Sequence, residues 1–169
     1  MLEKMIDETP EAVFFRYSAD CAYHLFNLGR IKKDQYIRIL KCREKQEVPD
    51  RAFLEAVYPA AMERINRLAK TLGKNHWDVE VIRKYFLEEH NKVIDRGEGY
   101  YATAPNTLKE LCKVRIGIVR AKGNRNTYRV DFGDREEDVV GKYVPNAGVG
   151  DRISTHWKVA IEILEHKNT

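Results

Sequence analysis

The spacing of apolar residues changes part-way along the chain, and this change limits the folds that are open to it. In the first part apolar side chains recur every three or four residues, as at Val13 and Tyr17, which is typical of the buried face of an α-helix. From residue 108 onward the alternation has a period of two, as at Val114 and Ile116, which is typical of β-strands. The sequence therefore predicts an α+β protein in which helices precede a sheet.

Capping residues divide the first part into four helices. Thr9-Pro10-Glu11 predicts the start of a helix that runs to Gly29, with a hydroxyl cap and a proline in the first turn. A second helix is expected over 33–45, a third from Pro49-Asp50 to Gly73 with a kink at Pro59, and a fourth from Asn75 or Asp78 to about residue 95. Four amphipathic helices favour a small bundle, which we assign to residues 1–95. In the second helix we expect inward positions at Tyr36, Ile37 and Leu40, with Ile39 as a further candidate.

The second part is expected to be a small barrel. We interpret residues 96–107, with Gly97, Gly99 and Pro105, as a linker. In residues 108–169, short alternating segments are separated by turn-forming runs at 122–126 and 145–148. Closure protects the edges of so small a sheet, so we predict a small closed or nearly closed β-barrel.

Composition excludes several classes of protein. The apolar runs are far shorter than the ~20 residues that span a bilayer, and the first residues lack an apolar leader, so we expect a cytoplasmic protein with no membrane partner. Three widely spaced cysteines without a C-x-x-C pair argue against disulfides and structural zinc. Phosphate-binding and nucleophile motifs are missing, so we do not expect an enzyme.

Three segments of the second part stand in order: residues 112–119 read CKVRIGIV, residues 130–133 read VDFG, and residues 143–164 read YVPNAGVGDRISTHWKVAIEIL. With this order and spacing they resemble the HypC/HupF family of hydrogenase maturation chaperones. The first segment stands where the family barrel begins with a cysteine, the second is similar to a turn of the family, and the third is similar to its closing segment. The resemblance implies that residues 108–169 form a HypC-like (OB-like) barrel of five strands.

The resemblance implies a metallocentre-assembly or adaptor factor. Members bind the partner protein HypD and carry an iron–cyanide–carbonyl unit to the hydrogenase large subunit, so a HypD-like or large-subunit-like partner and transiently carried iron are implied. Carried over to this chain, the iron-contacting cysteine is Cys112 and the nearby histidine is His156. Counting by twos, we expect Cys112 to begin the first strand and point inward, and His156 to point outward. The partner-contacting residues that we expect are Arg115, Gly117, Asp131 and Trp157.

An alternative is an RNA- or protein-binding module in which the barrel is only a scaffold. Basic residues cluster on the first barrel hairpin, at Arg120, Lys122, Arg125 and Arg129. They could contact phosphates, but acidic neighbours and a net charge of only +4 weaken such a patch. The polar run Glu88-Glu89-His90 is interpreted as a solvated helix face. A third hypothesis is an enzyme with its site between bundle and barrel, which a cleft containing His90, Tyr100, Cys112 and His156 would indicate.

Overall fold

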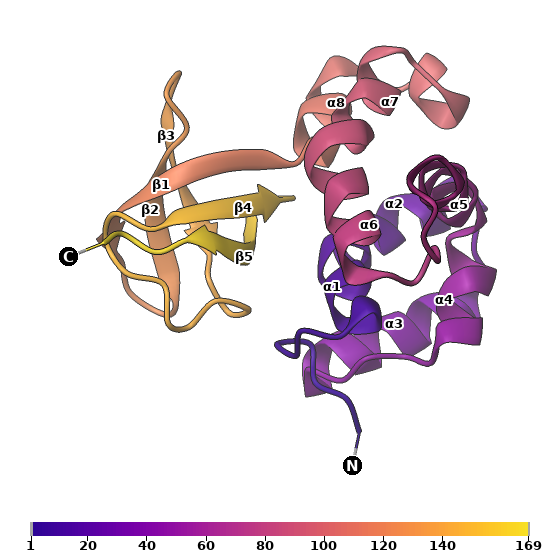
Figure 1. Ribbon diagram of the computed structural model, residues 1–169, viewed down its shortest axis with the longest axis horizontal. Coiled ribbons are helices and arrows are strands. Elements are labelled where there is room, and N and C mark those ends of the chain that lie inside the picture. Colours follow the sequence, from indigo (N-terminus) through magenta and orange to yellow (C-terminus); the bar gives the residue numbers. More distant parts are fainter. Residues whose placement is uncertain (1, 169) are drawn as a thin grey trace. The chain divides into compact units, whose positions relative to one another are not determined.

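The computed structural model describes residues 2–168, which form two compact units: one up to Glu89 and one from His90 onward. Helices make up the first unit, and the second contains a closed barrel (Figure 1). The mixed helix-and-sheet class that the sequence predicts is confirmed. Within residues 2–168, no helix combines the length and the apolar character needed to cross a lipid bilayer.

The helices of the first unit begin and end mostly where the capping residues predict. They are α1 (Pro10–Ser18), η1 (Ala19–Cys21), α2 (Ala22–Asn27), α3 (Lys33–Lys45), α4 (Arg51–Val57), α5 (Pro59–Leu72), α6 (Val79–Lys84) and η2 (Tyr85–Glu89), the last a π-helical segment. At the start of α1, Thr9 accepts a hydrogen bond from the Ala12 amide at 3.3 Å. The helix predicted from Pro49-Asp50 to Gly73 is interrupted immediately before Pro59, which separates α4 from α5. The single helix predicted up to Gly29 is instead divided by η1.

Aromatic rings from four segments form the centre of the first unit. The Phe14 ring meets those of Tyr58, Trp77 and Phe86 at centroid distances of 5.5, 5.7 and 5.8 Å, and Tyr17 stacks on Phe86 at 4.6 Å. Burying an aromatic ring contributes more to the free energy of folding, per side chain, than burying most other residue types. The aromatic cluster therefore fixes α1 against η2 within this unit.

The buried face of α3 was predicted only in part. Ile39 is fully buried and Tyr36 is half-buried, whereas Ile37 and Leu40 remain 40% and 38% exposed. Apolar residues at 36, 37, 39 and 40 span too wide an arc to be buried together on one face.

The second unit begins with a short helical segment and continues into the barrel. The helical elements are α7 (His90–Asp95), η3 (Gly99–Ala102) and α8 (Asn106–Cys112). Tyr101 of η3 is buried with Val93 and Ile94. Residues 96–107 therefore pack as part of the second unit, whereas we had expected a linker there and a domain boundary at 95.

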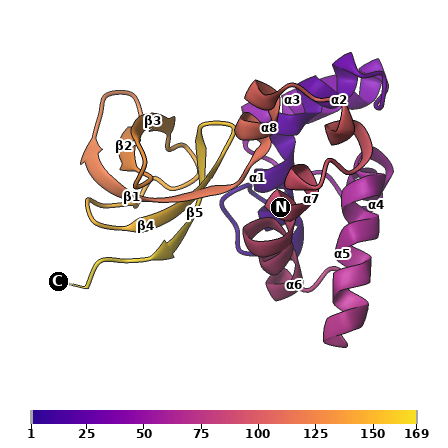
Figure 2. The same cartoon turned by 90° about the horizontal axis from the view of Figure 1, so that it is seen from above.

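Five strands close the barrel in the order β1-β2-β3-β5-β4. They are β1 (Arg115–Lys122), β2 (Thr127–Asp131), β3 (Glu136–Val140), β4 (Arg152–His156) and β5 (Val159–Glu165). Neighbouring strands are antiparallel except for β3 and β5, and the long β1 pairs with both β2 and β4 (Figure 2). The interior is filled by Val119, Tyr128, Val130, Val139, Val144, Ala147, Ile153 and Ala160.

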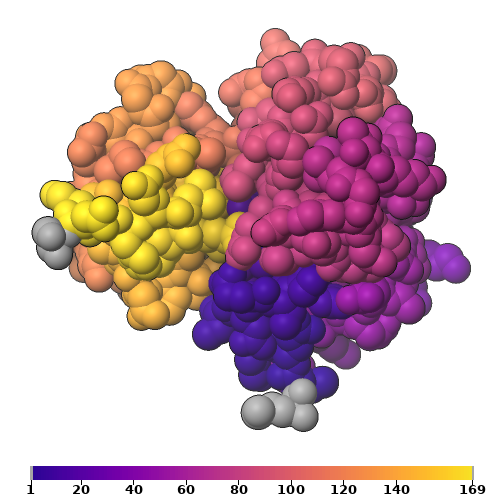
Figure 3. Space-filling view, viewed as in Figure 1, coloured from indigo at the N-terminus to yellow at the C-terminus, as the bar shows by residue number. Residues whose placement is uncertain are grey.

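A buried carboxylate fastens the chain after β5 to the loop before β4. Asp151 accepts hydrogen bonds from the backbone amides of Gly148 at 2.8 Å and Lys167 at 2.9 Å, and His166 Nδ1 lies 3.1 Å away. The segment after β5, yellow in Figure 3, lies on the surface of this unit. Burial alone would raise the pKa of Asp151, but the bonds from Gly148, Lys167 and His166 lower it overall.

We expect Asp151→Asn to lower the free energy of unfolding by about 1–3 kcal/mol at pH 7, since bonds to a charged acceptor are lost. A carboxyl with a lowered pKa stabilises the fold above its unfolded pKa, and the contribution disappears as pH falls through its folded pKa. The difference between the two proteins in urea unfolding should therefore shrink below about pH 4. Asp138→Asn, which alters an exposed pair with Arg129, serves as the control and should change stability by less than ~1 kcal/mol.

Candidate functional site

Cys112 ends a helix and does not begin a strand. It is the last residue of α8, and β1 starts at Arg115. Its side chain is fully buried with Val93, Ile94 and Tyr101. The predicted strand position is therefore wrong, because helix α8 continues to the cysteine before the chain extends.

Two histidines meet at the backbone carbonyl of Cys112. His90 Nε2 and His156 Nε2 each lie 2.9 Å from this oxygen, and the two rings are perpendicular with centroids 5.6 Å apart. A carbonyl oxygen only accepts hydrogen bonds, so both Nε2 atoms carry a hydrogen. The last carbonyls of a helix lack partners within that helix. For the final carbonyl of α8, that of Cys112, the two imidazoles serve as the hydrogen-bond donors.

Both histidines are buried, which corrects two predictions. His156 is 1% exposed although it was expected to face outward, and His90 is 6% exposed although it was assigned to a solvated face. The alternation along β4 still places Ile153 in the barrel interior. The His156 side chain lies on the outer face of β4, where it packs against His90 of α7 and Cys112 of α8.

Asn91 joins the same region and has no counterpart in our sequence analysis. Its Nδ2 donates to the Val114 carbonyl at 2.7 Å, and its Oδ1 accepts from the Val114 amide at 2.9 Å. The side chain thus pairs with the backbone between α8 and β1 as a neighbouring strand would. A side chain that binds backbone leaves no spacing pattern in the sequence that could have identified it.

This arrangement does not fit the iron cargo that the resemblance implies. The Cys112 side chain is fully buried in an apolar cluster, and the contact with His156 is made through the backbone carbonyl of Cys112. A cysteine that carries iron must present its sulfur to the metal. Across residues 2–168, no three His, Cys, Asp or Glu side chains are grouped so that they could hold a metal ion.

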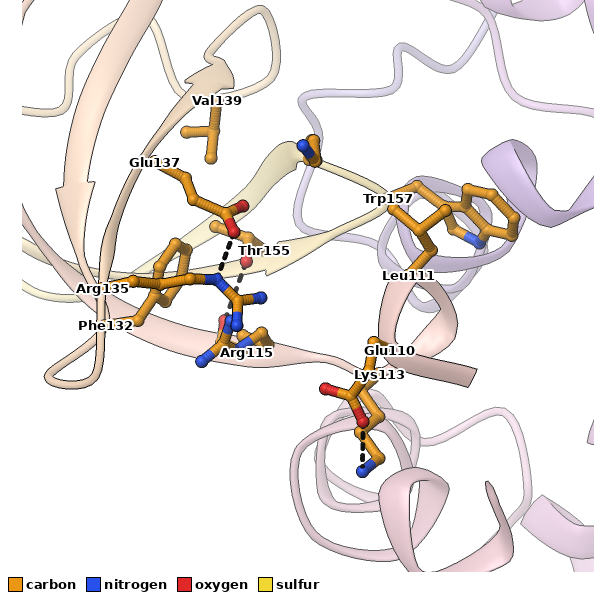
Figure 4. A pocket seen from close by; sticks show the side chains of 11 residues that line it. Glu110, Leu111, Lys113, Arg115, Phe132, Arg135, Glu137, Val139, Thr155 and Trp157 are labelled. Carbon is orange, nitrogen blue, oxygen red and sulfur yellow. Dashed lines mark hydrogen bonds and ion pairs between the residues drawn. The ribbon is translucent and has the colours of Figure 1, made fainter. Parts of the chain in front are cut away.

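A pocket lies beside these residues at one end of the barrel (Figure 4). Its volume is about 70 Å³, which is room for a few water molecules or the end of one side chain, and far less than the several hundred Å³ of a typical cofactor site. It is lined by Glu110, Leu111, Lys113, Arg115, Phe132, Arg135, Glu137, Val139, Thr155, Trp157 and Lys158.

Arginine–carboxylate pairs organise the polar side of the pocket. Arg115 lies over the Phe132 ring at 4.7 Å and donates from Nη2 to Asp134 at 2.7 Å. Arg135 pairs with Glu137 and, at 3.4 Å, with Asp134. Burial alone would raise the pKa of Asp134, but the hydrogen bond and charge of Arg115 lower it overall. Stacking and pairing together hold the Arg115 guanidinium plane in place.

The turn between β4 and β5 forms the apolar rim. Trp157 and Lys158 have φ values of 53° and 59°, a left-handed conformation that residues other than glycine and asparagine seldom adopt. The Trp157 amide donates to the Leu111 carbonyl at 3.3 Å, and its side chain packs on the cluster around Tyr101. Packing therefore imposes the strained turn, and such strain is common at functional positions.

Of the predicted partner-contacting residues, Arg115 and Trp157 both line the pocket. Gly117 stands where β1 passes close to β2: a Cβ there would lie 2.5 Å from Val130 and 2.8 Å from the Asp131 carbonyl. Asp131 pairs with Arg120 at 2.7 Å. Gly117 and Asp131 are thus outside the pocket lining.

The basic hairpin residues are partly neutralised. The hydrogen bond from Arg120 lowers the pKa of Asp131, and Arg129 pairs with Glu136 and Asp138 at 3.3 and 3.2 Å. Within the described part of the chain, Lys122 and Arg125 make no ion pair. Only half of the predicted phosphate-contacting residues are thus left without a carboxylate partner.

Comparison of the chain with known protein families, with curated proteins and with solved structures found no match.

Proposed function

We propose that this protein is an adaptor or assembly factor that binds a partner protein through the second unit, as the likeness to the HypC/HupF family implies. The observation that carries the proposal is the pocket that Arg115 and Trp157 both line. A rigid aromatic side chain and a fixed arginine beside a small pocket are the residues that most often dominate protein–protein binding energy.

The proposal leaves out iron carriage through Cys112. Its side chain is buried in an apolar cluster, so the sulfur is not exposed to an iron unit held by a partner. The histidine beside it stabilises the end of a helix. Partner binding needs neither group to be exposed.

RNA binding is the weaker alternative. The strand order β1-β2-β3-β5-β4 is that of OB folds, many of which bind oligonucleotides. Such binding needs a basic track and aromatic rings on which bases stack. Here Arg120 and Arg129 are already paired with carboxylates, and the pocket is too small for a base, so a protein partner is favoured.

Co-expression with a HypD-type protein tests the proposal. We expect a complex that survives purification and is lost in Arg115→Glu and weakened in Lys158→Glu, which alters an exposed residue at the rim. Arg120→Glu, on the hairpin away from the pocket, is the matched control and should retain the complex. Circular dichroism verifies that each variant is folded.

A complex that forms equally well with all three variants would place the interface elsewhere and remove the proposal. Salt-sensitive RNA binding that is lost in Arg120→Glu with Arg125→Glu, and is unaffected by Arg115→Glu, would establish the alternative function instead.

A further inference from the structure

The pocket holds a buried hydrogen-bond donor without an acceptor. Nη1 of Arg115 is buried and has no hydrogen-bond partner among the described residues, although Nη2 of the same side chain binds Asp134. Leaving a buried donor unpaired is costly, and the cost is greater for a charged group than for a neutral one. Because Arg115 lines the pocket, the geometry points to an acceptor that arrives from outside the chain.

The surroundings of Arg115 determine which acceptor fits. Lys158 lines the rim, is exposed, and forms no ion pair within residues 2–168, so a second cation is available there. Leu111, Phe132 and Trp157 supply apolar walls. A group with an apolar stem and a negatively charged end satisfies both features, and charge-assisted bonds to a carboxylate are stronger than those to a neutral carbonyl.

We infer that the pocket binds the side-chain carboxylate of an acidic segment of the partner protein, with Arg115 Nη1 as donor and Lys158 as the second positive charge. This inference rests on the proposed function. The volume of about 70 Å³ admits one such carboxylate and not a nucleobase. Stacking on Phe132 and pairing with Asp134 fix the guanidinium before the ligand arrives, which reduces the entropy lost on binding.

The inference can be tested on the full chain with short peptides as probes. The ligand is acetyl-Gly-Leu-Glu-Leu-Gly-amide, and its matched control replaces the glutamate by glutamine. Binding is followed by NMR through the Arg115 Nε–H and Trp157 indole N–H signals. We expect the glutamate peptide to shift both signals in the low millimolar range and the glutamine peptide to bind at least about ten-fold more weakly.

Variants assign the effect to the pocket. Arg115→Lys keeps the charge but removes Nη1 and should weaken binding about ten-fold, since lysine cannot reproduce the guanidinium geometry. Lys158→Ser, at an exposed position that does not endanger folding, should weaken it several-fold. Arg120→Lys should leave the affinity unchanged.

Two results with these peptides would overturn the inference: equal binding of the glutamate and glutamine peptides, or failure of both signals to shift. Two further probes would also overturn it. One is a glutamine peptide with a free C-terminal carboxylate in place of the amide, if it binds more tightly than the glutamate peptide; the other is hexauridylate, if it binds in a manner that depends on Arg115. If the HypD-type complex forms and is lost in Arg115→Glu while the glutamate peptide does not bind, the adaptor function stands and the carboxylate inference alone fails.

Discussion

Asn91→Ala is expected to lower the free energy of unfolding of the second unit by about 2–4 kcal/mol, because each buried backbone group that loses its partner costs about 1–3 kcal/mol. The variant removes both the donor and the acceptor that serve the Val114 backbone, and Val114 is 5% exposed. Asn91→Asp should be nearly as harmful at neutral pH, since a carboxylate can accept from the amide but cannot donate to the carbonyl.

The measurement is urea unfolding of the full chain in a Trp77→Phe background, so that Trp157 fluorescence reports the second unit alone. Asn146→Ala, the same change at an exposed loop position, is the control and should alter stability by less than ~0.5 kcal/mol. A loss of the same small size for Asn91→Ala would show that the Val114 backbone does not depend on this side chain.

The element boundaries that were predicted correctly are mostly set by capping and turn-forming residues close to them in the sequence. Asp50 caps α4 by accepting from the Phe53 amide at 2.9 Å, and Gly73 ends α5 with φ 65°. The turn over 122–126 likewise joins β1 and β2, with positive φ at Arg125 and Asn126. Each of these features is set by residues within one turn of the position concerned, so a single sequence contains the information.

The candidate site was harder to predict because it is built from long-range contacts to backbone atoms. His90 and His156 converge on the carbonyl of a residue 22 and 44 positions away, and any residue could supply that carbonyl. The tight turn at Trp157-Lys158 lacks the glycine or asparagine that marks such turns. Its conformation depends on where Trp157 packs, which is a property of the folded unit.

The resemblance led us to expect Cys112 and His156 to be neighbours, and the structure shows a contact between them through the backbone of Cys112. The contact joins the His156 ring to the Cys112 carbonyl, while the side chain of Cys112 packs with Val93 and Tyr101. Sequence similarity can place two residues near each other, but it does not determine which of their atoms meet.

The second large effect is expected from the two histidines together. We expect His156→Ala to lower the free energy of unfolding by about 2–4 kcal/mol, since a buried ring and a hydrogen bond are both lost. His90→Ala should cost less, because His90 is slightly more exposed. In either single variant the remaining histidine still donates to the Cys112 carbonyl.

The double variant should therefore lose more stability than the sum of the two single losses, by about 0.5–3 kcal/mol, because only then is the carbonyl at the end of α8 left without a partner. Urea unfolding of the four proteins in the Trp77→Phe background measures this coupling, with His76→Ala, at a half-buried histidine of the first unit, as the control. An iron-binding role predicts a different pattern: His156→Ala would change the iron content of protein co-expressed with a HypD-type partner and leave stability nearly unaltered. Strictly additive losses would contradict the shared-acceptor arrangement, because two donors that satisfy the same oxygen cannot be energetically independent.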